Sequence, residues 1–206
     1  MEDRAAGFDY PASSRFGTAT LAPAQLVLSQ ELANTIGLGH LPDFVDLLGQ
    51  VDTAQHWIDA VLPHWCASFG ADDPHLLATE AELPRLRAVR DTLRSVLGDH
   101  DALRTDAVIT GTAGVTITSA GAHLEPRGSG AAWLAAAIAI EAATAHGQDT
   151  FRRLKLCHEP LCRTALYDRS KNNSRVWHDT ATCGNKANAR AHRARRRATA
   201  RDDPSQ

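Results

Sequence analysis

Three cysteines and one histidine near the C-terminus have the types and the spacing of metal ligands. Four residues separate Cys157 from Cys162, and after a spacer four residues also separate His178 from Cys183. Zinc binds thiolate sulfur and imidazole nitrogen in a closed tetrahedron, and two close ligand pairs joined by a spacer supply that geometry. Because all four positions are filled by side chains, the pattern predicts a structural Zn²⁺ site without an open position for a catalytic water.

The sequence leaves two alternatives to this ligand set. The four side chains can be ordinary buried groups, although three Cys and one His at paired spacing rarely coincide. His158 can replace His178, but it directly follows Cys157, and adjacent residues do not readily bind the same ion. Cys66 is far from the other cysteines in an apolar stretch, so we expect it to be a small core residue.

The charges of the chain divide between its two parts. Residues 1–150 hold 8 basic and 19 acidic residues, whereas residues 151–206 hold 14 basic and 5 acidic residues. A basic end of this kind favours a polyanionic partner. The chain has 19 Arg and 3 Lys. Arg makes the bidentate contacts to phosphate and guanine that Lys does not, but a high-GC coding sequence explains the same bias.

The metal-ligand segment is followed by a predicted helix over about 185–200 that has almost no large apolar side chains. Lys186, Arg190, Arg193 and Arg197 recur at helical spacing and form a basic stripe, which can lie against phosphates or can simply be solvated. In the loop between the ligand pairs, Arg169, Lys171 and Arg175 are candidate backbone contacts. Asn172 and Asn173 favour turn formation over base contact. The predicted nucleic-acid contacts are Arg169, Lys171, Arg175, Asn185, Lys186, Arg190, Arg193 and Arg197.

The elements that precede this segment are mostly helical. Apolar periodicity predicts helices over 23–36, 52–62, 82–97 and 131–146, with Pro63 ending or kinking the second. The last of the four is apolar nearly all round and should be central. Alternating residues with a Gly-containing turn predict a β-hairpin over 115–127. Trp57, Trp65 and Trp133 can line a pocket, but their helical spacing favours core packing.

Together these patterns predict an α+β protein. A flexible tail (1–17) precedes a mainly helical N-terminal domain with the β-hairpin (18–150), and a small zinc-stabilised module ending in a basic helix (151–201) precedes a short tail (202–206). The N-terminus has no signal-peptide layout, and the longest apolar run is too short to span a bilayer. We therefore expect a cytoplasmic protein without a membrane partner, in which reduced thiols favour metal over disulfides.

The C-terminal residues resemble the CGNR zinc finger family. The resemblance rests on the C-x4-C pair at 157–162, the YDRS run at 167–170, RVWH at 175–178, CGNK at 183–186 and the basic helix that follows. The family usually has Cys where this chain has His178, and Arg where it has Lys186. Histidine is an acceptable zinc ligand, whereas Lys keeps the charge but loses bidentate hydrogen bonding.

Proteins of this family commonly carry an N-terminal ABATE domain, described as a stress-induced transcription regulator. Residues 26–35, an apolar stretch ending in Ala-Asn-Thr, are similar to the beginning of that domain, and the helices and hairpin follow in the expected order. The resemblance implies a bacterial regulator that binds double-stranded DNA, with an N-terminal domain that senses a small effector or forms a homodimer.

Two other functions remain open from the sequence. The zinc module can instead bind RNA, although few exposed aromatics are available for base stacking. It can also be a protein-interaction module whose basic finger neutralises the acidic N-terminal part. We do not expect an enzyme, because the scattered histidines do not assemble with a nucleophile and an orienting group.

Overall fold

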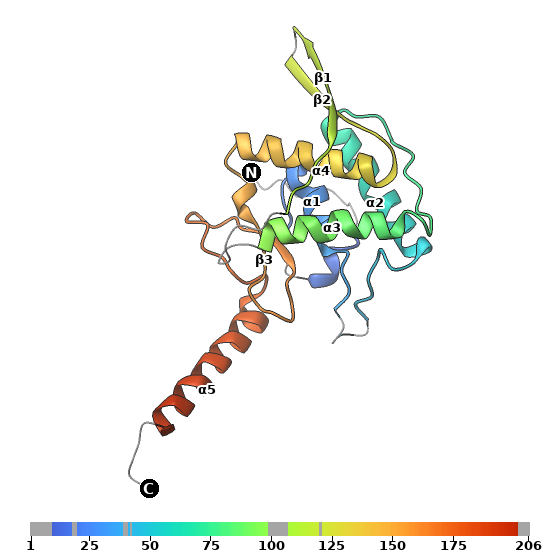
Figure 1. Ribbon diagram of the computed structural model, residues 1–206. Coiled ribbons are helices and arrows are strands. Elements are labelled where there is room, and N and C mark those ends of the chain that lie inside the picture. Colours follow the sequence, from blue (N-terminus) through green and yellow to red (C-terminus); the bar gives the residue numbers. More distant parts are fainter. Residues whose placement is uncertain are drawn as a thin grey trace.

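A computed structural model shows a helical body from which one long helix projects (Figure 1). The structure describes residues 10–17, 20–38, 41, 43–98, 107–119 and 121–201. Residues 1–9 of the predicted flexible tail and the predicted tail 202–206 lie outside these residues. Within the described part of the chain, no helix is both long and apolar enough to cross a bilayer.

The short helix α1 (Val27–Asn34) is buried on all sides at the centre of the body. It follows the 3-10 turn η2 (Ala24–Leu26) and contacts α2, α3, α4 and β4. The predicted helix over 23–36 is therefore shorter than expected and ends before Gly37. Its polar side chains are buried and paired: Glu31 accepts hydrogen bonds from the backbone of Ala12 and Ser13 at 3.0 and 2.8 Å.

These two bonds fix part of the segment that was expected to be a flexible tail. Residues 14–16 form the turn η1 (Ser14–Phe16), and Ala12 and Phe16 are buried. A buried carboxylate that accepts two backbone N–H groups holds the chain at that point. Residues 10–17 are thus packed against the body.

Helix α2 (Val51–Phe69) is longer than the predicted helix over 52–62. Pro63 lies inside it, so the expectation that proline ends this helix is wrong. Proline removes one helical hydrogen bond, but the apolar face continues beyond it with Trp65 and Cys66, both buried. The helix ends at Gly70, which has a left-handed φ of 63°.

Helices α3 (Leu83–Gly98) and α4 (Gly130–Gly147) agree closely with the predicted ranges. One charged side chain of α3 is buried. Arg90 is 4% exposed and pairs with Asp46 at 2.7 Å. The loop that carries Asp46 covers this side of α3, and the helical periodicity of α3 alone does not reveal it.

The predicted hairpin is present as β1 (Thr112–Thr118) and β2 (Gly121–Arg127), which pair antiparallel with Val115 opposite Leu124. Its base packs on α4, and its tip projects from the body on the side away from the C-terminus (Figure 1). The strand begins at Gly121, within the predicted turn, and Ala120 lies outside the described residues.

The large aromatic residues of the helices pack in the core. Trp57 and Trp65 are fully buried, and Trp133 is 5% exposed. The Trp65 ring stacks on Phe69 with centroids 4.5 Å apart and meets Trp133 edge-on at 5.4 Å. The structure therefore supports core packing for these residues.

The C-terminal module begins with the turn η3 (Phe151–Arg153) and a second antiparallel pair, β3 (Leu154–Leu156) and β4 (Ala165–Tyr167). A π-helical turn, η4 (Thr180–Gly184), continues into α5 (Asn185–Arg201). The predicted α+β class, with a hairpin and a small C-terminal module ending in a helix, is confirmed.

The apolar core extends from the helices into the module. Leu154, Leu156, Ala165 and Tyr167 belong to the same buried cluster as the core side chains of α1 to α4. The Asn34 side chain of α1 also bonds both backbone groups of Ala165, at 2.7 and 3.0 Å. The predicted boundary at residue 150 is therefore not marked by a break in the core.

Candidate metal centre and nucleic-acid interface

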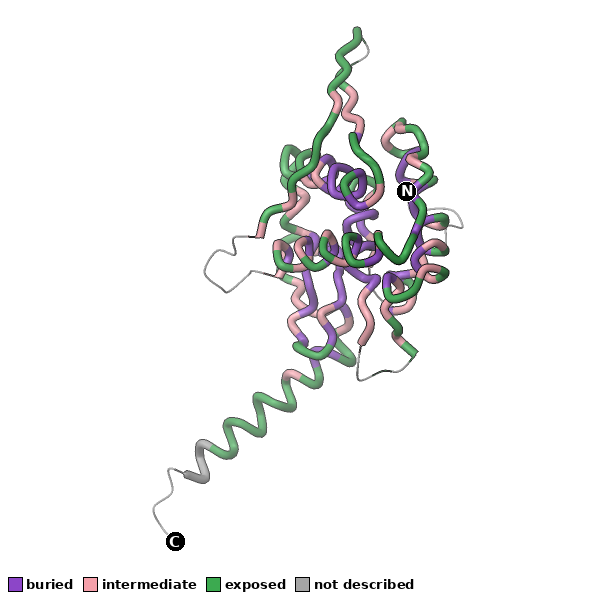
Figure 2. Tube along the Cα trace, turned by 45° about the vertical axis from the view of Figure 1, so that its right-hand side comes forward, coloured by how far each residue is buried: buried purple, intermediate pink, exposed green. Residues whose placement is uncertain are grey.

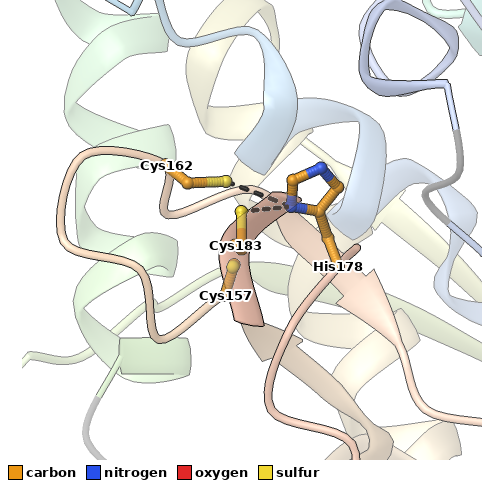
Figure 3. Close-up of side chains that lie close together, drawn as sticks. All are labelled: Cys157, Cys162, His178 and Cys183. Atoms are coloured by element: carbon orange, nitrogen blue, oxygen red, sulfur yellow. Dashed lines mark hydrogen bonds between the residues drawn. The ribbon is translucent and has the colours of Figure 1, made fainter. Parts of the chain in front are cut away.

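The four predicted metal ligands meet at one buried point between the loop after β3 and the start of the last helix. One ligand atom from each of Cys157, Cys162, His178 and Cys183 lies within 4.8 Å of all the others. The Nδ1 atom of His178 is 3.2 Å from the Cys162 sulfur and 3.4 Å from the Cys183 sulfur (Figure 3).

These separations fit a zinc ion. Zn–S and Zn–N bonds of about 2.3 and 2.0 Å place tetrahedral ligand atoms roughly 3.5–3.8 Å apart. The donor set of three thiols and one imidazole suits zinc, and all four residues are buried. The chain thus has a Cys₃His zinc-binding site. His178 and not His158 belongs to the ligand cluster, and the His158 ring instead packs edge-on against Trp177 with centroids 5.9 Å apart.

Hydrogen bonding favours the thiolate form at Cys162, where the Thr164 hydroxyl lies 3.0 Å from the sulfur. Hydrogen bonding to Cys162 and burial raise the pKa of the Cys157 thiol, and burial raises the pKa of the Cys183 thiol. Hydrogen bonding from Cys157 lowers the pKa of the Cys162 thiol, and His178 and Thr164 lower it further. A low thiol pKa favours metal binding because the thiolate is the ligand.

Arg175 holds the backbone on both sides of the metal-binding histidine. Its guanidinium donates to the carbonyl of Trp177 at 2.8 Å and to the carbonyl of His178. It also donates to the Thr20 hydroxyl at 2.8 Å. We had predicted a DNA-backbone contact for Arg175, but these three partners give its side chain an internal role.

A buried ion pair organises the loop between the two ligand pairs. The Lys155 ammonium on β3 is 2.9 Å from Asp168 and also donates to the carbonyl of Asn173. Asp168 accepts from the backbone of Ser170 and Arg175 as well. Burial alone would raise the pKa of Asp168, but hydrogen bonds led by that of Lys155 hold this pKa well below its ordinary value. Asp168 therefore holds the turn between the two ligand pairs.

A small apolar cluster surrounds the metal ligands. Trp177 packs against the buried group formed by the three cysteines and Leu166. A Cβ atom on Gly184 would lie 3.2 Å from the Trp177 ring and 3.1 Å from the Thr180 methyl group. Glycine at this position therefore allows the turn after Cys183 to approach the tryptophan closely.

The last helix begins at Asn185, as predicted, and a π-helical turn leads into it. Asp179 caps the π-helical turn by accepting from the backbone N–H of Ala181 at 2.8 Å, and the chain continues into α5 without a break. Asn185, a predicted nucleic-acid contact, donates its side-chain amide to the Ala181 carbonyl at 2.8 Å. Cys183 thus lies on the helical segment, and the metal site forms the base of α5.

Helix α5 projects into solvent and carries most of the predicted nucleic-acid contacts. Lys186, Arg193 and Arg197 are exposed, as is nearly the whole helix as far as residue 197 (Figure 2). Arg190 differs, because its guanidinium bonds the Glu159 carboxylate at 2.6 and 3.0 Å. The basic stripe does not predict the ion pair of Arg190 with Glu159, because the two residues are 31 positions apart in the sequence.

The two remaining predicted contacts in the loop between the ligand pairs have different surroundings. Lys171 is exposed at the turn that Asp168 organises, and Arg169 is exposed but donates to the Leu21 carbonyl at 3.1 Å. Asn173 has a left-handed φ of 50°, which agrees with the predicted turn role. The structure therefore concentrates the exposed positive charge on α5.

Comparison with known proteins agrees with the metal centre. No curated protein matches the chain. Residues 153–196 match the sequence profile of the CGNR zinc finger, a span that begins beside β3, includes all four ligands and ends within α5. The C-terminal module of this chain is therefore similar to the CGNR zinc finger family in both its sequence and its ligand set.

Proposed function

We propose that this chain is a zinc-dependent DNA-binding protein that regulates transcription, and that α5 is the element that contacts double-stranded DNA. The observation that carries the proposal is the exposure of α5 together with its composition. The helix holds seven Arg and Lys residues and no acidic residue, and it has no apolar face to bury.

A helix of this composition has little stability on its own. Like charges three and four residues apart destabilise a helix, and most helical stability in proteins comes from packing of an apolar face. Phosphate groups relieve the repulsion and release counterions when Lys and Arg neutralise them. A helix of 17 residues is roughly 25 Å long and is narrow enough for the major groove of B-DNA.

The distribution of charge over the whole chain supports the same orientation. Residues 1–150 carry an excess of acidic side chains and would be repelled by DNA. Helix α5 leads away from the helical body instead of lying on it (Figure 1). This arrangement favours an external polyanion over neutralisation of the acidic part by the basic helix.

The role of the N-terminal part follows from the ABATE resemblance and is proposed on that ground. It would adjust DNA binding in response to stress, through a small effector or through a homodimer, in the cytoplasm. The three tryptophans of the body pack in its core, as their helical spacing favoured.

The test is binding of a fluorescein-labelled random-sequence duplex by the zinc-loaded chain across a salt series. We expect affinity to fall steeply with salt, and the double variant Arg193→Gln/Arg197→Gln to lower the salt slope by about two. The matched control is Arg127→Gln, which removes one exposed cation from the hairpin at the far side of the molecule. Lack of binding by the zinc-loaded chain would reject the proposal, and stronger competition by RNA would favour an RNA target.

A further inference from the structure

One acidic side chain lies within the zinc module at the base of the basic helix. Glu159 is located between the ligands Cys157 and Cys162, and its side chain is 2% exposed. The Glu159 carbonyl accepts from the backbone N–H groups of Cys162 and Arg163 at 2.9 and 3.1 Å. The backbone of Glu159 is therefore fixed in the same loop that carries two of the zinc ligands.

The partner of this carboxylate is Arg190, about two turns beyond Cys183 on α5. Each guanidinium nitrogen of the pair meets a different carboxylate oxygen, at 3.0 and 2.6 Å. Such parallel bonds restrict both distance and orientation, and they are stronger than neutral hydrogen bonds. If Arg190 were removed, a buried carboxylate would lose its cation, which is unfavourable.

The remaining side chains of α5 provide little further packing. Ala187 is half-buried, and the residues from Asn188 to Arg197 are exposed. The direction of the helix therefore depends on contacts close to its base. The bonded pair joins α5 to the first ligand loop, whereas the helix itself continues from the last ligand.

We propose that Glu159 and Arg190 form a clamp that sets the direction in which α5 leaves the zinc module, and that Arg190 is a positioning residue and not a DNA contact. This inference rests on the proposed function for its effect on DNA affinity. The clamp itself can be tested without DNA.

Electrostatics alone and the clamp make opposite predictions for Glu159→Gln. Removing a negative charge beside a basic helix should strengthen binding to a polyanion if Glu159 only repels phosphate. Loss of the clamp should weaken binding, because α5 would sample many directions and only some would fit the duplex. The sign of the change therefore separates the two explanations.

The experiment compares Glu159→Gln, Arg190→Gln and Arg190→Lys with Arg193→Gln in the zinc-loaded full chain, using the labelled random-sequence duplex. Glu159→Gln and Arg190→Lys should each weaken binding about fivefold with an unchanged salt slope, since neither removes a phosphate contact. Arg193→Gln should lower the slope by about one. Arg190→Gln should leave the salt slope unchanged. Adding Glu159→Gln to Arg190→Gln should cause little further loss of DNA affinity.

Amide hydrogen exchange over residues 186–192 provides the readout without DNA. We expect faster exchange in Glu159→Gln and Arg190→Lys than in Arg193→Gln, at equal zinc content. If Glu159→Gln loses zinc, Arg190→Lys alone decides the outcome. Unchanged exchange in Arg190→Lys, tighter DNA binding by a zinc-loaded Glu159→Gln, or a slope lowered by Arg190→Gln would each overturn the clamp. Faster exchange in a chain that binds no DNA would leave the clamp standing and reject only the proposed function.

Discussion

At the scale of single residues, the sequence identifies the zinc ligands but not the side chains that support them. The ligands are recognisable because zinc requires particular atoms at short spacing. Arg175, Lys155 and Glu159 could not be assigned this way, because their partners are carbonyl groups or side chains brought close only by folding. The RVWH run that contains Arg175 belongs to the family pattern, and it is the sequence signal that marks this position.

The first prediction concerns the last ligand. Cys183→Ser should reduce zinc from about one ion per chain to a small fraction, since a hydroxyl is a poor substitute for a thiolate. Metal content of protein purified without added zinc measures this. Cys66→Ser is the control, because Cys66 packs in the core away from the ligands and its replacement should leave zinc unchanged. Equal zinc in all three proteins would contradict the ligand assignment.

The second prediction concerns the buried pair of Lys155 and Asp168. Asp168→Asn should destabilise the protein by about 3–5 kcal/mol at neutral pH, because it leaves the Lys155 ammonium buried without its counter-charge. Urea unfolding followed by circular dichroism measures the change. Asp149→Asn is the control, since the pair of Asp149 and Arg152 is exposed and should contribute little.

The same pair implies a pH dependence with a defined sign. The folded pKa of Asp168 is lowered, so its stabilisation is complete above the unfolded pKa of about 3.9 and is lost as pH falls through the folded value. The wild-type protein should therefore lose more stability between neutral and acidic pH than Asp168→Asn does. A parallel loss in both proteins would show that another group is responsible.

At the scale of elements, the sequence predicted which segments are helical better than it predicted the residues at which each helix begins and ends. Apolar periodicity identified α3 nearly to the residue, because its apolar face is the buried face, and a long apolar run identified α4 equally well. The ends of α1 and α2 are set by tertiary contacts that local signals do not contain. The start of α5 at Asn185 was predicted, whereas the π-helical turn that precedes it and is capped by Asp179 was not.

The third prediction follows from the proline inside α2. Pro63 is exposed, so Pro63→Ala removes little packing, and it should stabilise the protein by about 1–3 kcal/mol by restoring a helical hydrogen bond. Thermal unfolding measures the effect. Pro84→Ala is the matched control, because Pro84 is exposed in the first turn of α3, where proline costs little. Destabilisation by Pro63→Ala would show that the helix depends on the proline.

At the scale of the whole molecule, the zinc module and the helical body share one core. The composition divides the chain into two parts of opposite charge. It did not predict that Gln30 and Asn34 of α1 bond to Ala165 of β4. Such contacts between residues more than 130 positions apart leave no periodic pattern in a single sequence.

The fourth prediction uses this shared core. Removal of zinc should lower the thermal midpoint of the whole chain, and the tryptophan fluorescence of the body should change in the same transition as release of the metal. Trp57, Trp65 and Trp133 report on the body, although Trp177 contributes from the module. Trp177→Phe therefore serves as the reporter protein. Two separate transitions would indicate independent units.

The most direct test of the central claim, that zinc holds α5 in a form that binds DNA, is a zinc titration of duplex binding by the wild-type chain. Zinc is removed with a chelator, the apoprotein is dialysed, and affinity for the labelled duplex is measured as zinc is returned. We predict that affinity falls by about tenfold or more without zinc and recovers as about one ion per chain is added. Equal affinity of the zinc-free and zinc-loaded chains would contradict the account.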